Sequence, residues 1–410
     1  MTCQTSAPQP LSGSNRLELE PWKQGHLFGD WGGERSRLEG RGVTFDVQYV
    51  GDHLWNIKSP QPERLASWNR VRGTVDLDLG DVAHWKGTYF HATALWQTGG
   101  NLGAYLGLLT GPSGMASGNA FRLDSWWLEK RLRDDRLAMR LGQFAAQDFY
   151  GVEHYGASFI FEPMGYALGN LFTTYESFDP PSTPAMELRV LPFTRFYAKS
   201  IVFAADRYPY SHNFIGLVPQ FRGAVMNVSE IGFSPGLKST AVRGFDNVGT
   251  RNGYSGLYKF GGAYNPGKFA IPDQSTPRAG NYLLYWMANQ AIWRRDKTES
   301  KGIDATISYD WSPANVNRND REFNAGLRYN EPFPFRCHNT ISLGYAGNHL
   351  SSAFRLPGSR PFKVEHALEL NSMLHVTPSM LAQPVFQYYL NAGGGTHRVV
   401  VVGLRTKLDF

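Results

Sequence analysis

The sequence contains no run of roughly eighteen apolar residues, the minimum that a helix needs to cross a bilayer. A membrane-spanning helix is therefore excluded. A closed β-barrel is the other backbone arrangement that satisfies its own hydrogen bonds in lipid. Cysteine is scarce, with only Cys3 in the N-terminal tail and Cys337 beside a Phe/Pro-rich turn. This scarcity argues against a disulfide framework and against a Cys-based metal site.

Clustered positive charge is also missing, although the chain carries a net charge of +6 and has a pI near 9.1. Lys and Arg are scattered along the sequence, and no nucleic-acid-binding motif accompanies them. We therefore expect no nucleic-acid partner. Charged side chains lining the lumen of a barrel would account for the same excess, and an Arg-lined lumen would favour neutral polyols or anions over cations.

Aromatic residues and glycine are abundant, with aromatics at 14% and 44 glycines, yet the mean hydropathy of −0.36 is that of a water-soluble protein. A membrane barrel combines these properties because it alternates apolar and polar residues and gathers aromatics at the lipid interfaces. An aromatic-rich soluble β protein, such as a lectin or glycosidase sandwich, has the same composition. Composition alone therefore does not distinguish a membrane barrel from a soluble β protein. The length of 410 residues is compatible with one large barrel.

From Val43 onward, segments of roughly ten residues alternate apolar and polar side chains between clusters of Gly, Pro, Asn, Asp or Ser. The last of them, Val399 to Phe410, places Leu404 on one face and Arg405 on the other. We count about sixteen such strands. They begin near Val43, Ser67, Thr88, Ala120, Arg136, Ala185, Phe196, Ala224, Ser255, Gly280, Gly302, Glu322, Asn339, Phe362, Met380 and Arg398.

The pattern predicts an all-β fold, a closed antiparallel transmembrane β-barrel of about sixteen strands with a short N-terminal helical segment. We expect residues 1–42 to form an N-terminal tail with a short periplasmic helix, and residues 43–410 to form the barrel. Long connections, such as Ala146 to Pro184, alternate with short turns, as they do in outer-membrane barrels. We expect Ala146 to Pro184 to fold inward as a constriction loop; a surface loop capping the barrel is the alternative.

Residues 29–33 read Gly-Asp-Trp-Gly-Gly and are followed by Arg35, a short helical segment, Gly42 and the first strand. This stretch, His26 to Asn56, resembles the N-terminal signature of the carbohydrate-selective porin family, the OprB type. Later blocks resemble the family in the same order: residues 136–144, 280–293, the strand of Glu365 and Glu369, and 383–395. Asn-Ala-Gly at 391–393 replaces the usual Asn-Pro-Gly, and Ser211 to Gly223 has no counterpart that we can align.

The resemblance implies a bacterial outer-membrane porin that passes mono- or small oligosaccharides passively. Its expected partners are small sugars, outer-membrane lipids and lipopolysaccharide, and the barrel-assembly machinery through the strand ending in Phe410; a monomer and a homo-trimer both remain open. No secretory signal is visible at the start, so we expect that a signal peptide has been removed. An anion-selective or general diffusion porin is the alternative, and a soluble carbohydrate-binding β protein is a further one.

The candidate sugar contacts are the polar residues of the inferred inner face and of the constriction loop. Hydrogen bonds to charged groups can replace the hydration of sugar hydroxyls. The set is Arg72, Asp76, Glu129, Arg140, Glu153, Arg328, Glu365, Glu369 and Gln387. For each of them a salt-bridged lumen residue is the competing interpretation.

No catalytic, cofactor or metal site is expected. Glu365 and Glu369 lie four apart on one strand face, about 13 Å apart, which exceeds the separation of about 9.5 Å at most in glycosidases. The sequence lacks a Gly-x-Ser-x-Gly element and a zinc-spaced histidine pair, and its paired glycines lack a phosphate-binding frame. We therefore expect no enzyme.

Overall fold

A computed structural model describes residues 25–116, 118–152, 158–165, 182–206, 212–235, 249–251, 254–272, 274–295, 301–332, 339–354 and 363–410. Its strands are β1 (Val43–Lys58), β2 (Arg64–Asp78), β3 (Thr88–Gly99), β4 (Ala120–Leu132), β5 (Leu137–Phe144), β6 (Thr183–Phe193), β7 (Phe196–Ala205), β8 (Ala224–Phe233), β9 (Gly249–Arg251), β10 (Tyr254–Phe269), β11 (Arg278–Arg294), β12 (Gly302–Trp311), β13 (Asn319–Asn330), β14 (Thr340–Leu350), β15 (Val364–Thr377), β16 (Met380–Leu390) and β17 (Arg398–Asp409).

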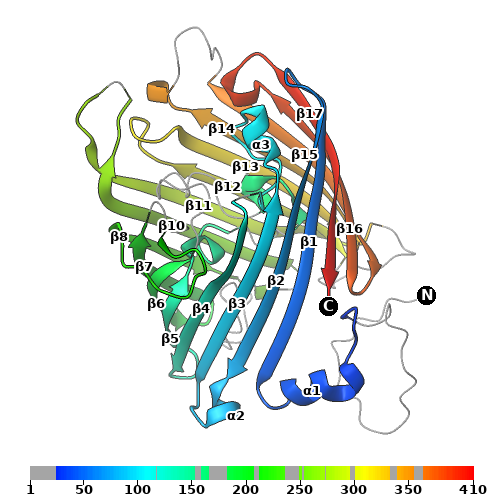
Figure 1. Cartoon of the computed structure of the whole chain (residues 1–410), viewed down its shortest axis with the longest axis vertical. Coiled ribbons are helices and arrows are strands. Elements are labelled where there is room, and N and C mark those ends of the chain that lie inside the picture. The colour runs from blue at the N-terminus through cyan, green and yellow to red at the C-terminus, as the bar shows by residue number, and fades with distance from the viewer. Residues whose placement is uncertain are drawn as a thin grey trace.

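The strands form one closed antiparallel ring (Figure 1). Apart from β8 and β9, each strand pairs with its neighbours in sequence, and β1 closes the ring by pairing with β2 on one side and β17 on the other. The three-residue β9 lies in line with β8, because both strands pair with β10. The architecture is therefore a closed 16-strand barrel, as the alternation predicted. Closure leaves no unpaired sheet edge, which is what allows a β-sheet to span lipid.

The predicted strand starts agree with the structure to within three residues. The largest offsets are at β2, expected from Ser67 and beginning at Arg64, and at β13, expected from Glu322 and beginning at Asn319. Both strands begin earlier than the clean alternation does. The ends of strands are set by hydrogen bonding to the neighbouring strand, so the side-chain pattern alone identifies them less well than the strand centres.

The apolar face of each strand is the outer surface of the barrel. On β12, Asp304, Ser308 and Asp310 point inward and are at most 1% exposed, whereas Ile307 and Trp311 point outward with 39% and 37% of their surface exposed. The register of the neighbours carries this alternation around the ring. The barrel therefore presents apolar side chains to the hydrocarbon and polar side chains to its interior, as expected.

The described residues include four short α-helices: α1 (Glu34–Glu39) before the first strand, and α2 (Leu79–Ala83), α3 (Leu102–Leu106) and α4 (Glu162–Gly165) in connections between strands. Short 3-10 turns, η2 (Trp31–Gly33), η3 (Ala146–Asp148), η5 (Ser352–Phe354) and η6 (Ala392–Gly394), accompany them. Among the described residues no helix has the length and apolarity needed to cross a membrane. Helix α2 follows β2 at the same end of the barrel as α1 and the C-terminus (Figure 1).

The N-terminal signature segment is fastened to the end of the last strand. Arg35 is 6% exposed and donates from Nη1 to the carbonyl of Phe45 (2.8 Å) and from Nη2 to the carbonyl of Phe410 (2.9 Å). Its guanidinium lies 4.8 Å from the ring centre of Trp31, and the rings of Phe28 and Phe410 are 5.3 Å apart. These contacts join β1, the short helix and the last strand at the seam where the ring closes.

Replacing Arg35 by alanine is expected to destabilise the barrel at this seam. The change leaves the carbonyls of Phe45 and Phe410 without their charged donor, at a cost of about 2 kcal/mol. The temperature at which the barrel loses its compact electrophoretic mobility should fall. Arg37→Ala is the matched control, because Arg37 is exposed and pairs with Glu34 on the same helix. An equal fall in both variants would contradict this role for Arg35.

Candidate functional site

The connection between β5 and β6 enters the lumen, and its first part binds the inner wall of β6, β7, β8 and β10. Lys199 donates to the carbonyl of Phe149 (2.6 Å), and Lys259 donates to that of Val152 (3.0 Å). The Tyr150 hydroxyl donates to Glu187 (3.0 Å), and the Tyr150 side chain is fully buried. Burial, followed by the neighbouring Glu187 carboxylate, raises the pKa of the Tyr150 phenol well above 10.0, so it stays a donor.

The second part of this connection binds the opposite region of the wall. The amides of Ile160 and Phe161 both donate to the Glu369 carboxylate at 2.8 Å. The carbonyl of Ser158 accepts from Asn371 (2.9 Å) and Gln383 (3.1 Å). Since β7 and β15 are far apart around the ring, the described parts of the segment, residues 146–152 and 158–165, lie inside the barrel and reach both regions. The predicted inward course of this loop is confirmed for these residues.

A second connection, between β3 and β4, also folds inward. The amides of Leu109 and Thr110 donate to the Glu365 carboxylate, at 3.0 and 2.7 Å for their shortest contacts. The same carboxylate accepts from the amide of Gly393 in the loop after β16 (2.5 Å). Ser113 donates to Asp52 on β1 (2.6 Å). The length of Asn101 to Asn119 was evident from the sequence, but its course into the lumen was not.

The two inward segments are joined to each other by backbone hydrogen bonds. The amide of Gly114 donates to the carbonyl of Ile160 (2.8 Å), and the amide of Glu162 donates to the carbonyl of Gly111 (2.9 Å). The Glu162 carboxylate also accepts from the amide of Gly111 (3.0 Å). Residues 101–116 and 158–165 therefore form one unit, which we call the inner plug. It is attached to β15 through Glu365 and Glu369.

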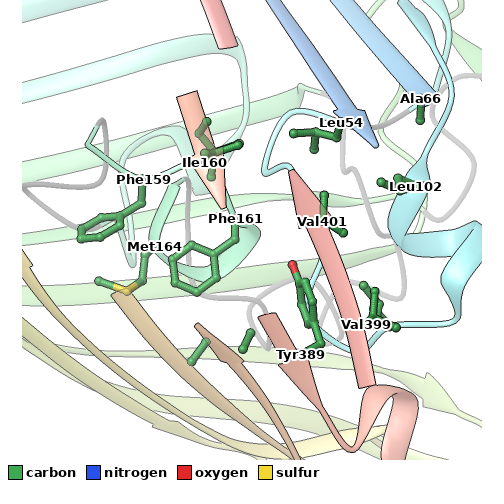
Figure 2. Close-up of a cluster of buried hydrophobic side chains, with 14 residues drawn as sticks. Leu54, Ala66, Leu102, Phe159, Ile160, Phe161, Met164, Tyr389, Val399 and Val401 are labelled. Atoms are coloured by element: carbon green, nitrogen blue, oxygen red, sulfur yellow. The ribbon is translucent and has the colours of Figure 1, made fainter. Parts of the chain in front are cut away.

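An apolar cluster fixes the plug against the wall (Figure 2). Phe159, Phe161 and Met164 are at most 1% exposed and share this cluster with wall residues such as Val401. The rings lie close to the backbone of β14. A Cβ atom added to Gly344 would be 2.9 Å from ring atoms of both Phe159 and Phe161. A glycine is therefore needed there for the plug to approach the strand.

A buried ionic cluster lines the wall beside the first part of the β5–β6 connection. Glu129 accepts from Arg131 (2.5 Å) and from Arg140 (2.7 Å), and the Nη1 atom of Arg140 lies 3.4 Å from a carboxylate oxygen of Glu187. The Arg140 guanidinium also stacks 4.1 Å from the ring centre of Trp127. Glu129 and Arg140 are 1% and 2% exposed, so in this structure their charges neutralise one another beneath the loop.

Several inward side chains of β2 and β3 are more accessible, although others on the same strands, such as Trp68 and Thr93, are buried. Arg72 is half-buried, and within the described part of the chain its Nε atom is enclosed without a hydrogen-bond partner. The Asp76 side chain is 48% exposed and contacts the Nδ1 atom of His91 at 2.7 Å. The His91 ring stacks on Trp127, with ring centres 4.7 Å apart. This surface, made of Arg72, Asp76, His91 and Trp127, is called the β2–β4 wall below.

The sequence-predicted residues thus fall into different surroundings. Arg72 and Asp76 lie on the accessible wall, while Glu129 and Arg140 lie in the buried ionic cluster. Arg328 is one-quarter exposed and binds Asp304 at 2.8 Å. Glu153 lies outside the described residues. The remaining three, Glu365, Glu369 and Gln387, are at most 1% exposed and hold the plug; Gln387 donates to the carbonyl of Pro112 (2.8 Å) and to Glu369 (2.8 Å).

The inner face differs in one respect from the expectation that all of its polar residues line water. The plug and the loops cover much of the polar wall of β5–β8 and β12–β16, and apolar clusters form between loop and wall. The sequence signal that could have shown this is the pair of inward glycines, Gly326 and Gly344, in otherwise alternating strands. Within the described residues no group of three or more His, Cys, Asp or Glu side chains is placed to hold a metal ion.

A closed sixteen-stranded barrel with an apolar exterior, a polar inner wall and loops folded into its lumen has the architecture of a porin. The profile of the family described as "Carbohydrate-selective porin, OprB family" matches residues 63–410. Porin B of Pseudomonas aeruginosa is 22% identical, over 94% of this chain and 91% of that protein.

Solved structures show the same fold. The high-pH structure of Pseudomonas putida OprB covers 95% of this chain and 99% of its own, with a TM-score of 0.84 and 19% identity. Salmonella typhi OmpF, in complex with daunomycin, has a TM-score of 0.55 and 9% identity over 91% of this chain and 98% of its own. The chain belongs to the carbohydrate-selective porin family, the OprB family. It is an outer-membrane porin for carbohydrates, and porins are channels rather than enzymes.

Proposed function

We propose that sugars pass along the β2–β4 wall, between this wall and the inner plug. The observation that carries the proposal is the contrast in accessibility of the inward side chains. Asp76 keeps half of its side-chain surface exposed, whereas Glu187, Glu230 and Glu369 on the covered wall are at most 2% exposed. A solute can replace water only at side chains that water reaches, so the contacts belong on β2 and β3.

The chemistry of this wall suits a polyol. The Arg72 guanidinium offers several donors, and the Asp76 carboxylate accepts, so adjacent hydroxyls of one sugar can bind both. Binding must stay weak so that the solute can leave. We expect a millimolar dissociation constant, which corresponds to a binding free energy of about 4 kcal/mol. Charges of opposite sign on one wall give the passage no strong net preference for ions, which favours a neutral solute.

Arg72→Ala and Asp76→Ala should each reduce the preference for sugars, by about threefold or more if one charged hydrogen bond is lost. Liposome swelling with a panel of sugars, compared with zwitterionic solutes of the same size, measures this preference. Val71→Ala and Val75→Ala are matched controls, because these neighbours belong to the outward, apolar series of β2. Unchanged preference in both charge variants would remove the β2–β4 wall from the passage and leave the porin fold intact.

The inner plug acts, in this proposal, as the filter that narrows the barrel. Its position depends on Glu365 and Glu369, which we assign as positioning residues rather than sugar contacts. Their carboxylates are fully buried and already accept backbone amides of the plug. Arg328, Glu129 and Arg140 support the wall on either side through their ion pairs. Gln387 joins the first half of the plug to the wall, because it donates to the carbonyl of Pro112 and to Glu369 on β15.

Residues 43–410 form the channel and residues 1–42 an appendage at its periplasmic end; the chain catalyses no reaction and needs no cofactor. Outward side chains contact lipid and lipopolysaccharide. The assembly machinery engages the strand that ends in Phe410, so deleting Phe410 should lower the amount of barrel in outer membranes far more than deleting Met1. Light scattering in detergent distinguishes a monomer from a trimer by mass.

A further inference from the structure

The connection between β7 and β8 takes an unexpected course, because part of it lies on the outside of the barrel. The carbonyl of Ile215 accepts from the backbone amide of Leu123 on β4 (2.8 Å). The carbonyl of Gly216 accepts from the side chain of Gln143 on β5 (2.9 Å), and Asn213 donates back to Gln143 (2.9 Å). Gln143 belongs to the outward series of β5 with Met139 and Leu141, which are 47% and 56% exposed.

Gln143 itself is fully buried, since the loop covers it. The close approach requires a glycine. Gly216 has a φ of +81°, and a Cβ atom there would lie 1.8 Å from the carbonyl oxygen of Leu123. The amide of Val218 donates to the Asn213 side chain (3.1 Å), and this bond closes the turn. These contacts define one docked conformation for residues 213–221 against β4 and β5, which we call the outer flap.

The outer flap presents apolar side chains to its surroundings. Its sequence, Asn-Phe-Ile-Gly-Leu-Val-Pro-Gln-Phe, contains no charged residue. The exposed apolar side chains are Phe214 (56%), Ile215 (58%), Leu217 (63%), Val218 (61%) and Phe221 (86%). Phe121 on the outward face of β4 is exposed to 70%, so the flap continues the apolar surface of the wall beside it. Such a surface in a loop facing water would be a liability for aggregation.

The wall beneath the flap is short. Strand β5 has 8 residues, whereas β1 has 16 and β11 has 17. At about 3.4 Å per residue and a tilt near 45°, eight residues span roughly 19 Å, less than the apolar band of about 25 Å on such barrels. The flap docks near the end of β5 that leads into the long β5–β6 connection, the end that faces outward from the cell in outer-membrane barrels. The flap therefore covers the part of the apolar band that β5 is too short to reach.

We propose that the outer flap inserts into the outer leaflet and contacts lipid acyl chains, so that it completes the apolar band of the barrel above β4 and β5. The occupant of this surface is hydrocarbon, because the flap is uncharged, continuous with the outward wall and placed where that wall is too short. This inference adds a membrane contact to a segment outside the sugar passage, and it does not depend on the residues assigned to that passage.

The experiment places an environment-sensitive fluorophore on the flap in reconstituted vesicles. Phe221→Cys, in a chain with Cys3→Ala and Cys337→Ala, is labelled with a nitrobenzoxadiazole group. Met139→Cys on the outward wall is the lipid-facing control. Gln274→Cys, exposed in the loop after β10 at the same end of the barrel, is the water-facing control. Lipids brominated on their acyl chains and aqueous iodide report the two environments.

The flap label should be quenched by brominated lipid at least half as strongly as the label at 139, and iodide should quench it weakly. The label at 274 should show the reverse. Retained compact mobility on electrophoresis establishes that each variant is folded. Strong iodide quenching at 221 would overturn the proposal by placing the flap in water. Protection from both quenchers, together with disulfide crosslinking between copies of Phe221→Cys, would overturn it in favour of a second copy of the chain.

Discussion

Replacing Glu369 by alanine is expected to open the barrel. The carboxylate accepts the amides of Ile160 and Phe161 and the side-chain amides of Gln387 and Asn371, all within 2.8 Å. Without it these buried donors lose their partner, at about 1 to 3 kcal/mol for each unsatisfied group. Water would then satisfy them only if the plug leaves the wall. Single-channel conductance should rise by about twofold or more, because the aqueous cross-section grows.

The neighbouring Leu370→Ala is the matched control, because Leu370 lies on the same strand, points outward and is half exposed. Its conductance should equal that of the wild type. Glu369→Gln keeps one acceptor oxygen and should give an intermediate value. Glu365→Ala should act in the same direction through the amides of Leu109 and Thr110. Wild-type conductance in both alanine variants, with the barrels folded, would show that the plug holds its place without the carboxylates.

A large side chain in place of Gly344 should push the plug away from β14. Gly344→Leu brings atoms into the space of the Phe159 and Phe161 rings, which already lie 2.9 Å from the position of a Cβ. Overpacking of this kind costs about 1 to 3 kcal/mol, and the loop can yield more easily than a strand held in the barrel on both sides. Conductance should increase and become noisier, while the barrel keeps its compact mobility.

Gly73→Leu is the control for this change, because Gly73 is also a strand glycine and nothing lies within 4 Å of its added Cβ. The expected result is a conductance equal to that of the wild type. Should Gly344→Leu leave conductance and noise unchanged, the rings of Phe159 and Phe161 would have to repack without moving the plug, and the filter would be less rigid than its packing indicates.

The barrel could be predicted from the sequence because each strand has one apolar and one polar face. The alternation of Asp304, Ser308 and Asp310 with Ile307 and Trp311 shows the period, the inner face and the outer face at once. The ring was expected to close, because the unpaired edges of an open sheet could not satisfy their backbone hydrogen bonds in lipid. The course of the loops could not be predicted in this way, because their contacts join segments far apart in the sequence and no periodic pattern of residues marks them.

The candidate site illustrates the same limit. Alternation correctly placed Glu365 and Glu369 on the inner face, but it could not distinguish a carboxylate that meets solute from one that holds a loop. That difference depends on which backbone amides reach the carboxylate, Leu109 and Ile160 among them, and those amides belong to connections of irregular structure. The outer flap was visible only as Ser211 to Gly223, a segment that did not match the family.

The central claim is that the barrel selects sugars because the plug, held by β15, narrows the passage along the β2–β4 wall. The most direct test is the ratio of swelling rates for glucose and for a zwitterionic solute of the same size, in the wild type and in Glu365→Ala/Glu369→Ala. The account predicts a ratio clearly above one in the wild type and near one in the double variant, with faster entry of both solutes. An unchanged ratio in a folded, fully open double variant would contradict it.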